Sequence, residues 1–406
     1  MKLFKKILIG TGVTVLVAAL ACGATVYGLW HNEISGILSI RKLVDGKKEN
    51  ASGPVYEIEV PGDYYFDDFL AQGGAKNDQE LIDFLVKNLT KGIIPITLNA
   101  PSIGCSSFTF QDEDGDRYFA RNYDFSTTTS MIVHTAPGNG RHASISSADL
   151  QFLGITGGRE IDSFMDRALA LVSTYVPLDG INDAGVSCGI YMSYQKDDGV
   201  VSSTDQNTDK PDLTSTTMLR MILDYADDVD EAVELVKRYD FHDSANTSFH
   251  YMVADASGKS AILEWVQPDG HVNDDDGTKR ELRVYYNDDD NALGTVEGED
   301  DFQYITNFLV TPGYYDSDDQ KGGYDRYREI PETIDPTGSN GKGLFSKEEG
   351  LSLLKTLGRR SWDADKESDG NGITVWSSLY NLTDRTVTWV SNEEFDIEGS
   401  VFEYSL

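Results

Sequence analysis

The sequence predicts an α+β fold in which antiparallel strands alternate in blocks with helices. Three observations predict it. Strand-like stretches recur nine times after residue 105, several of them are joined by hairpin-type turns such as 112–116 and 256–258, and helical periodicity appears in separate blocks between them. This order favours layers of sheet and helix over a βαβ repeat.

Composition limits the class of protein before any motif is considered. The 406 residues include 68 Asp or Glu and 34 Lys or Arg, which gives a formal net charge of −34. A nucleic-acid binder needs clustered cations, so this class is excluded, and the acidity predicts a well-solvated surface. Three cysteines are too few for a disulfide framework. No metal site is predicted, because the Asp-rich stretch 273–301 lacks the spacing of an EF-hand calcium site. No cofactor is predicted either.

The N-terminus predicts a membrane anchor. Residues 1–6 contain three lysines, and residues 7–30 form a run of 24 residues without a charge, against the ~20 that a membrane-spanning helix needs. The lysines place residues 1–6 in the cytoplasm, so we expect a single-pass protein of a bacterial cell membrane with the rest of the chain extracytoplasmic. A cleaved signal peptide, or one lipidated at Cys22, remains an alternative.

Residues 31–104 predict a stalk and pro-segment, because they show no sustained periodicity until Asn77. From Asn77 a capped helix is expected to run to Gly92. Residues 105–406 are expected to form the main domain. Its nine predicted strands are 106–111, 117–124, 131–135, 186–194, 248–254, 260–266, 282–286, 373–381 and 386–390, and its predicted helices are 160–173, 215–226, 229–239 and 347–357.

Cys105 is the candidate nucleophile. It follows Gly104 and begins a predicted strand. If the Gly104–Cys105 bond were cut, Cys105 would carry a thiol beside its own α-amine, whose reference pKa of about 7.7–8.0 suits a general base. The hairpin that follows is expected to return Arg121 and Asp124 to this residue, where Arg121 would lower the thiol pKa and Asp124 would hold the ammonium.

These residues resemble the choloylglycine hydrolase family of N-terminal-nucleophile (Ntn) hydrolases, which includes bile salt hydrolases, penicillin V acylases and relatives of acid ceramidase. Cys105 with Arg121-Asn122-x-Asp124 matches the family's Cys and Arg-Asn-x-Asp motif, and further matches run in order to about Trp389. They comprise Asp179-Gly180-Ile181-Asn182, Phe249-His250-Tyr251, Ile305-Thr306-Asn307 and Tyr324-Asp325-Arg326-Tyr327.

The resemblance implies an αββα sandwich of antiparallel sheets and an amidohydrolase that cleaves linear N-acyl amides after exposing Cys105 itself. It implies an oxyanion-binding role for Asn307 and an active-site role for Arg326, with Asn122 and Asn182 in support. A backbone N–H at Met192 would complete the oxyanion site, because Met192 stands where bile salt hydrolases have an Asn. It implies no cofactor, and since family members are often tetrameric it is compatible with a homo-oligomer.

Two departures make bile salts a doubtful substrate: Met192, and an extra helical piece around 161–172. Two other functions stay open. One is a Cys–His hydrolase that uses His250 or His134 as the base. The other is a non-catalytic surface binding protein on the same fold, in which Gly104–Cys105 would stay intact.

Overall fold

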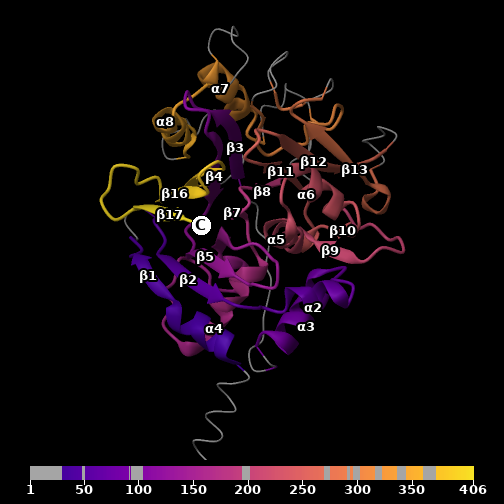
Figure 1. The fold of residues 1–406 in the computed structure, drawn as a ribbon, viewed down its shortest axis with the longest axis vertical. Coiled ribbons are helices and arrows are strands. Elements are labelled where there is room, and N and C mark those ends of the chain that lie inside the picture. Colours follow the sequence, from indigo (N-terminus) through magenta and orange to yellow (C-terminus); the bar gives the residue numbers. More distant parts are fainter. Residues whose placement is uncertain are drawn as a thin grey trace, which may run out of the picture.

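A computed structural model describes residues 30–47, 51–90, 92, 104–193, 202–268, 275–289, 293–295, 302–315, 322–335, 344–359 and 372–406. Two large sheets lie face to face, and helices cover the outer side of each (Figure 1). The layering agrees with the αββα sandwich expected from the sequence.

The larger sheet has nine strands. In spatial order they are β1 (Arg41–Val44), β2 (Val55–Pro61), β5 (Ser130–Ala136), β6 (Ser144–Asp149), β7 (Asp179–Asn182), β8 (Ser187–Met192), β11 (Phe249–Ala254), β12 (Ser260–Val266) and β13 (Glu281–Tyr286). Helices α5 (Ser215–Tyr225) and α6 (Val229–Val236) pack on β7, β8 and β11. Asp228 caps α6 by accepting from the backbone N–H of Glu231.

The smaller sheet has six strands and carries the predicted nucleophile. Their order is β14 (Tyr304–Ile305), β3 (Gly104–Gln111), β4 (Arg117–Phe125), β15 (Ile373–Asn381), β16 (Thr386–Ser391) and β17 (Val401–Ser405). Helices α7 (Tyr324–Ile334) and α8 (Lys347–Leu357) pack on β14, β3, β4 and β15, at the top of Figure 1. The remaining elements are α2 (Phe66–Ala71), α3 (Asp78–Asn88), α4 (Phe164–Ala170) and a small parallel pair of β9 (Asp212–Thr214) with β10 (Asp240–His242).

Polar contacts join the two sheets across the middle of the sandwich. The Tyr123 hydroxyl on β4 donates to Asp149 on β6, and the indole N–H of Trp389 on β16 donates to the Ser147 hydroxyl on β6. All four side chains are buried. Hydrogen bonds between buried polar groups fix the register of the two sheets more sharply than apolar contact alone.

The prediction of a stalk for residues 31–104 is wrong for much of its length. A helix spans residues 30–39, and β2 pairs in parallel with β5 over seven residues, so this segment forms one edge of the nine-stranded sheet. Phe66 and Phe69 of α2 are fully buried. The pairing of β2 with β5 also corrects the expectation of purely antiparallel sheets.

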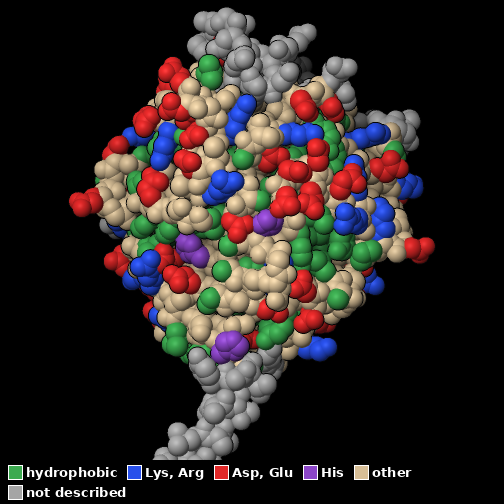
Figure 2. Space-filling view, in the orientation of Figure 1, with side chains coloured by type: hydrophobic (Ala, Val, Ile, Leu, Met, Phe, Trp, Pro, Cys, Tyr) green, Lys and Arg blue, Asp and Glu red, His purple; other side chains and the backbone are tan. Residues whose placement is uncertain are grey.

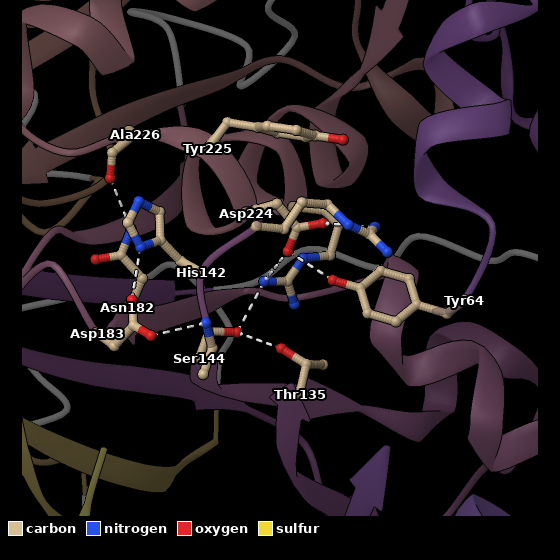
Figure 3. A network of polar contacts seen from close by, with 12 residues as sticks. Tyr64, Thr135, His142, Ser144, Asn182, Asp183, Asp224, Tyr225 and Ala226 are labelled. Atoms are coloured by element: carbon tan, nitrogen blue, oxygen red, sulfur yellow. Dashed lines mark hydrogen bonds and ion pairs between the residues drawn. The ribbon is translucent and has the colours of Figure 1, made fainter. Parts of the chain in front are cut away.

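Buried ionic contacts fasten this N-terminal segment to the rest of the fold. The Tyr64 hydroxyl donates to Asp224 of α5 (Figure 3). Arg141 forms ion pairs with Asp224 and with Asp63. Because these partners lie on both sides of the predicted cleavage point, the segment is an integral layer of the structure.

The other predicted regions differ in what the structure describes. The predicted cytoplasmic residues 1–6 and the anchor 7–30, apart from Trp30, lie outside the described residues. Within the described part of the chain, no helix combines the length and apolarity needed to cross a membrane. Acidic side chains are spread over the face shown in Figure 2 with basic ones between them.

Candidate active site

Cys105 lies at the start of β3 and is completely buried. Its Sγ accepts a hydrogen bond from Nη2 of Arg121 at 3.2 Å, and its backbone N donates to Oδ1 of Asn307 at 2.8 Å. Burial raises the pKa of the thiol to about 12, while the Arg121 charge acts in the opposite direction. The two atoms that an N-terminal nucleophile needs, its sulfur and its nitrogen, are therefore each held by a separate side chain.

The alternation of side chains along β4 explains why Arg121 reaches the sulfur. Successive side chains of a strand point to opposite faces. Arg121 points toward the other sheet, where its Nη2 donates to the carbonyl of Ile190 at 2.7 Å. Asn122 and Asp124 point the other way, toward the layer of α7 and α8. The strand therefore places Arg121 on the face that meets the other sheet, and Asn122 and Asp124 on the face covered by helices.

Asp179 on β7 fixes Arg121, a role that the sequence did not predict for it. Its carboxylate lies 2.9 Å from Nε of Arg121, and both side chains are fully buried. Asp179 also accepts from the indole of Trp376 and the hydroxyl of Tyr380. The guanidinium lies over the ring of Tyr191 at 4.5 Å. These contacts join residues that are far apart in the sequence, so no local sequence pattern could have predicted them.

Arg326 connects Asp124 to Asn307. From α7, its Nη1 donates to Oδ2 of Asp124 at 2.9 Å, and its Nη2 approaches Oδ1 of Asn307 at 3.4 Å. The other oxygen of Asp124 accepts from the Thr374 hydroxyl at 2.7 Å. The structure therefore brings Cys105, Arg121, Asp124, Asn307 and Arg326 into one contiguous buried cluster.

Met192 enters this cluster through its carbonyl. The Nδ2 of Asn307 donates to the Met192 oxygen at 3.0 Å. Asn307 therefore spans the gap between β3 and β8, with one end of its amide on Cys105 and the other on Met192.

Asn122 and Asn182 lie outside the cluster and hold secondary structure. Asn122 donates to the Leu354 carbonyl at the end of α8 and accepts from Ser377. Asn182 closes its own turn by accepting from the backbone N–H groups of residues 184 and 186, and it donates to the carbonyl of Ala226 (Figure 3). The contacts of Asn182 are those of a structural turn residue.

Neither predicted alternative base contacts the sulfur. His250 is buried, but its ring nitrogens face Glu264 at 2.9 Å and the Thr306 carbonyl at 3.0 Å. His134 lies on β5 with its ring against Tyr404, and burial lowers its pKa. The geometry gives no support to a Cys–His dyad. In the described residues, no group of three or more His, Cys, Asp or Glu is arranged to hold a metal ion.

Comparison with known proteins adds a family match that starts at the candidate nucleophile. The model of the linear amide C–N hydrolases, choloylglycine hydrolase family, matches residues 105–280. A bile salt hydrolase/transferase of Clostridium perfringens is 22% identical in an alignment of 243 residues that covers 56% of this chain. The match spans 60% of the length of that relative.

Several solved structures are similar. A variant of the conjugated bile acid hydrolase of Clostridium perfringens has a TM-score of 0.47 at 15% identity, with 74% of this chain and 92% of that chain covered. Penicillin V acylase from Agrobacterium tumefaciens has a TM-score of 0.41 at 17% identity, with coverage of 74% and 86%. The N-acylethanolamine-hydrolyzing acid amidase ortholog of Caenorhabditis elegans has a TM-score of 0.40 at 14% identity, with coverage of 69% and 93%.

Proposed function

Because residues 105–280 match the model of the choloylglycine hydrolase family of linear amide C–N hydrolases, we propose that this protein hydrolyses linear N-acyl amides with Cys105 as an N-terminal nucleophile. The observation that carries the proposal is the pair of contacts at Cys105, where Arg121 holds the sulfur and Asn307 holds the nitrogen. A buried structural cysteine needs neither contact.

The first step of the proposed reaction exposes the amine. The Cys105 sulfur attacks the Gly104 carbonyl, the C–N bond breaks as the C–S bond forms, and the proton of the thiol passes to the released nitrogen. Water then hydrolyses the thioester, which leaves a carboxyl group on Gly104 and a free thiol and amine on Cys105. Asn307 keeps the nitrogen in place during this exchange, because its Oδ1 already accepts from it.

The freed amine then serves as the base for the sulfur beside it. A group with a reference pKa of about 7.7–8.0 can take the thiol proton and return it to the leaving amine of the substrate. The nearby Arg121 charge stabilises the thiolate. Arg326 pairs with Asp124 and lies beside the Asn307 oxygen, so it fixes both side chains near the amine, and its charge also favours the thiolate of Cys105.

Asn307 is the proposed donor to the tetrahedral oxyanion. An Asn amide nitrogen carries two hydrogens, of which the Met192 carbonyl takes one. The second is directed to the substrate oxygen, and a backbone N–H near Met192 is the proposed partner donor. Loss of one donor of this kind lowers kcat by about 10²–10³.

The site sits on a chain that we propose to be held in a cell membrane by residues 7–30, with residues 31–406 outside the cytoplasm. The uncharged run and the three preceding lysines support this placement. Protease treatment of intact cells tests it: digestion of residues 31–406 without lysis agrees with the proposal, and protection until lysis contradicts it.

The activity is tested with the wild type, Cys105→Ala and Cys188→Ala. Cys188 is a second buried cysteine on β8 and serves as the matched control. Each protein is incubated with N-acyl amino acids, conjugated bile salts, penicillin V and N-acyl ethanolamines, and its N-termini are sequenced. We expect a new N-terminus at Cys105 and amide hydrolysis in the wild type and Cys188→Ala alone. An intact Gly104–Cys105 bond in an active wild type would refute the N-terminal mechanism, and an intact bond with no hydrolysis would favour a binding protein.

A further inference from the structure

The segment that carries Asn307 is fastened by a buried His–Glu pair that the proposed mechanism does not use. His250 lies on β11 and Glu264 on the adjacent β12, and neither side chain has any exposed surface. Nδ1 of His250 and Oε1 of Glu264 are 2.9 Å apart. The pair links the nine-stranded sheet, on which both residues lie, to residues 306–311.

Glu264 holds the far end of this segment. Its Oε1 accepts from the backbone N–H of Val310 at 2.7 Å. Its Oε2 accepts from both the backbone N–H and the hydroxyl of Thr311, at 2.9 and 2.6 Å. With His250, four donors surround one carboxylate, which matches the number of acceptor sites that an ionised carboxylate offers.

His250 holds the near end. Its Nε2 lies 3.0 Å from the carbonyl oxygen of Thr306, and that carbonyl belongs to the same peptide group as the N–H of Asn307. The N–H in turn donates to the carbonyl of Gly322 at 2.8 Å. Both polar atoms of the peptide between residues 306 and 307 are thus fixed, and with them the direction in which the Asn307 side chain leaves the backbone.

The partners of His250 also determine what the ring does. A carbonyl oxygen only accepts, and Glu264 is already an acceptor for three other groups, so both ring nitrogens act as donors. A ring that donates from both nitrogens has no lone pair for a thiol proton. His250 is therefore unsuited to be the base of Cys105, although it lies one peptide group from a residue that contacts Cys105.

We propose that His250 and Glu264 are positioning residues for Asn307, which keep its amide aligned between Cys105 and the oxyanion. The proposal rests on the proposed amide hydrolysis for its kinetic consequence. A misplacement of about 1 Å in such a group costs about 10²-fold in rate. The effect falls on kcat, because the interaction with Asn307 strengthens as the oxyanion forms.

Two substitutions of His250 separate its contacts. The amide nitrogen of Asn lies near the position of Nδ1, so His250→Asn keeps the donor to Glu264 and loses the donor to Thr306. The longer His250→Gln keeps the donor to Thr306 instead. His134→Gln is the matched control, because His134 is likewise a histidine on a strand of the larger sheet, and its partly buried ring contacts Tyr404 instead of the cluster.

The experiment measures kcat and KM for an N-acyl amide per mole of N-terminal Cys105, the alkylation rate of Cys105 by iodoacetamide, and hydrogen exchange of the peptide that contains residues 306–311. For His250→Asn we expect kcat to fall about 100-fold, KM to change less than about threefold, alkylation to stay within about threefold, and exchange of the segment to accelerate. His250→Gln is expected to lose less than about tenfold in kcat, and His134→Gln to resemble the wild type.

Three results would overturn the positioning role. Loss of alkylation in both His250 variants would make the histidine a base. Equal losses of kcat in the two variants, in proportion to their losses in melting temperature, would show that His250 contributes only to the general stability of the fold. Unchanged hydrogen exchange of residues 306–311 in His250→Asn would refute the claim that His250 and Glu264 hold this segment. The exchange measurement does not depend on catalysis. It therefore distinguishes a failure of the positioning role from a failure of the proposed amide hydrolysis.

Discussion

Replacing Asp179 by Asn is expected to destabilise the protein and, at the same time, to make Cys105 more acidic. Asp179 and Arg121 form an ion pair of 2.9 Å with no exposed surface on either side chain. Removing one charge leaves the other buried without compensation, which costs about 3–5 kcal/mol of unfolding free energy. Because both groups are fully buried, solvent screening does not reduce this magnitude.

The sign of the effect on the thiol follows from the charges around it. The Asp179 carboxylate raises the pKa of Cys105, whereas the Arg121 guanidinium lowers it. Asp179→Asn should therefore move the pKa of the thiol down, and Arg121→Gln should move it up. Both substitutions break the same ion pair and both destabilise, yet they shift thiol reactivity in opposite directions.

The assay is the pH dependence of Cys105 alkylation in the cleaved protein, combined with urea unfolding. Asp149→Asn is the control, since Asp149 is an equally buried carboxylate that is bound to Tyr123 and is not among the main charges that act on the pKa of Cys105. The midpoint of alkylation is expected at lower pH in Asp179→Asn, at higher pH in Arg121→Gln and unchanged in the control. Shifts of the same sign in the first two variants would refute the electrostatic reasoning.

Three further predictions follow from the fold. After cleavage, residues 30–92 should co-elute with the rest of the protein in native gel filtration, because β2 is paired along its length; separation without denaturant would contradict this. Gly189→Ala should lower kcat and cost about 1–3 kcal/mol of unfolding free energy, since a Cβ there would lie 2.8 Å from the Arg121 guanidinium. Gly372→Ala meets no atom of the described residues within 4 Å and should leave kinetics and melting temperature unchanged. Burial raises the pKa of Asp149 to about 6, so the folded state binds the proton more tightly than the unfolded state does. As the pH rises from 4 to 6, the wild type should therefore lose about 2 kcal/mol of unfolding free energy relative to Asp149→Asn, and an equal pH dependence of urea unfolding in the two proteins would contradict this.

The sequence was informative wherever local patterning coincides with burial. All nine predicted strands exist within a few residues of their expected ends, and the cap at Asn77 forms as predicted. The helix predicted from Glu160 begins instead at Phe164, because Ser163 and Asp166 form a capping box there.

Two of the elements that the sequence did not predict, β6 and α7, lack such a pattern. In β6, Ser144, Ser146 and Ser147 are buried polar residues, so the strand shows no apolar alternation. Helix α7 contains Pro331 in its interior, a residue that normally argues against a helix. Both elements depend on tertiary partners that are distant in the sequence.

Within the candidate site, the motif residues were predictable and their supports were not. Cys105, Arg121 and Asp124 follow a spacing that a single hairpin explains. The contacts of Arg121 with Asp179 and of His250 with Thr306 join residues that are separated by 58 and 56 positions in the sequence. Only the completed fold brings such pairs together.

The place of β2 inside a sheet has a consequence for how the protein would recover from denaturation. As a single chain, residues 55–61 find β5 at the high local concentration that a tether provides. Once the bond before Cys105 is severed, the same pairing becomes an encounter between two molecules, and regaining it depends on dilution and competes with aggregation. The processed form would then persist because it unfolds slowly, and its lifetime rather than an equilibrium constant would describe its durability.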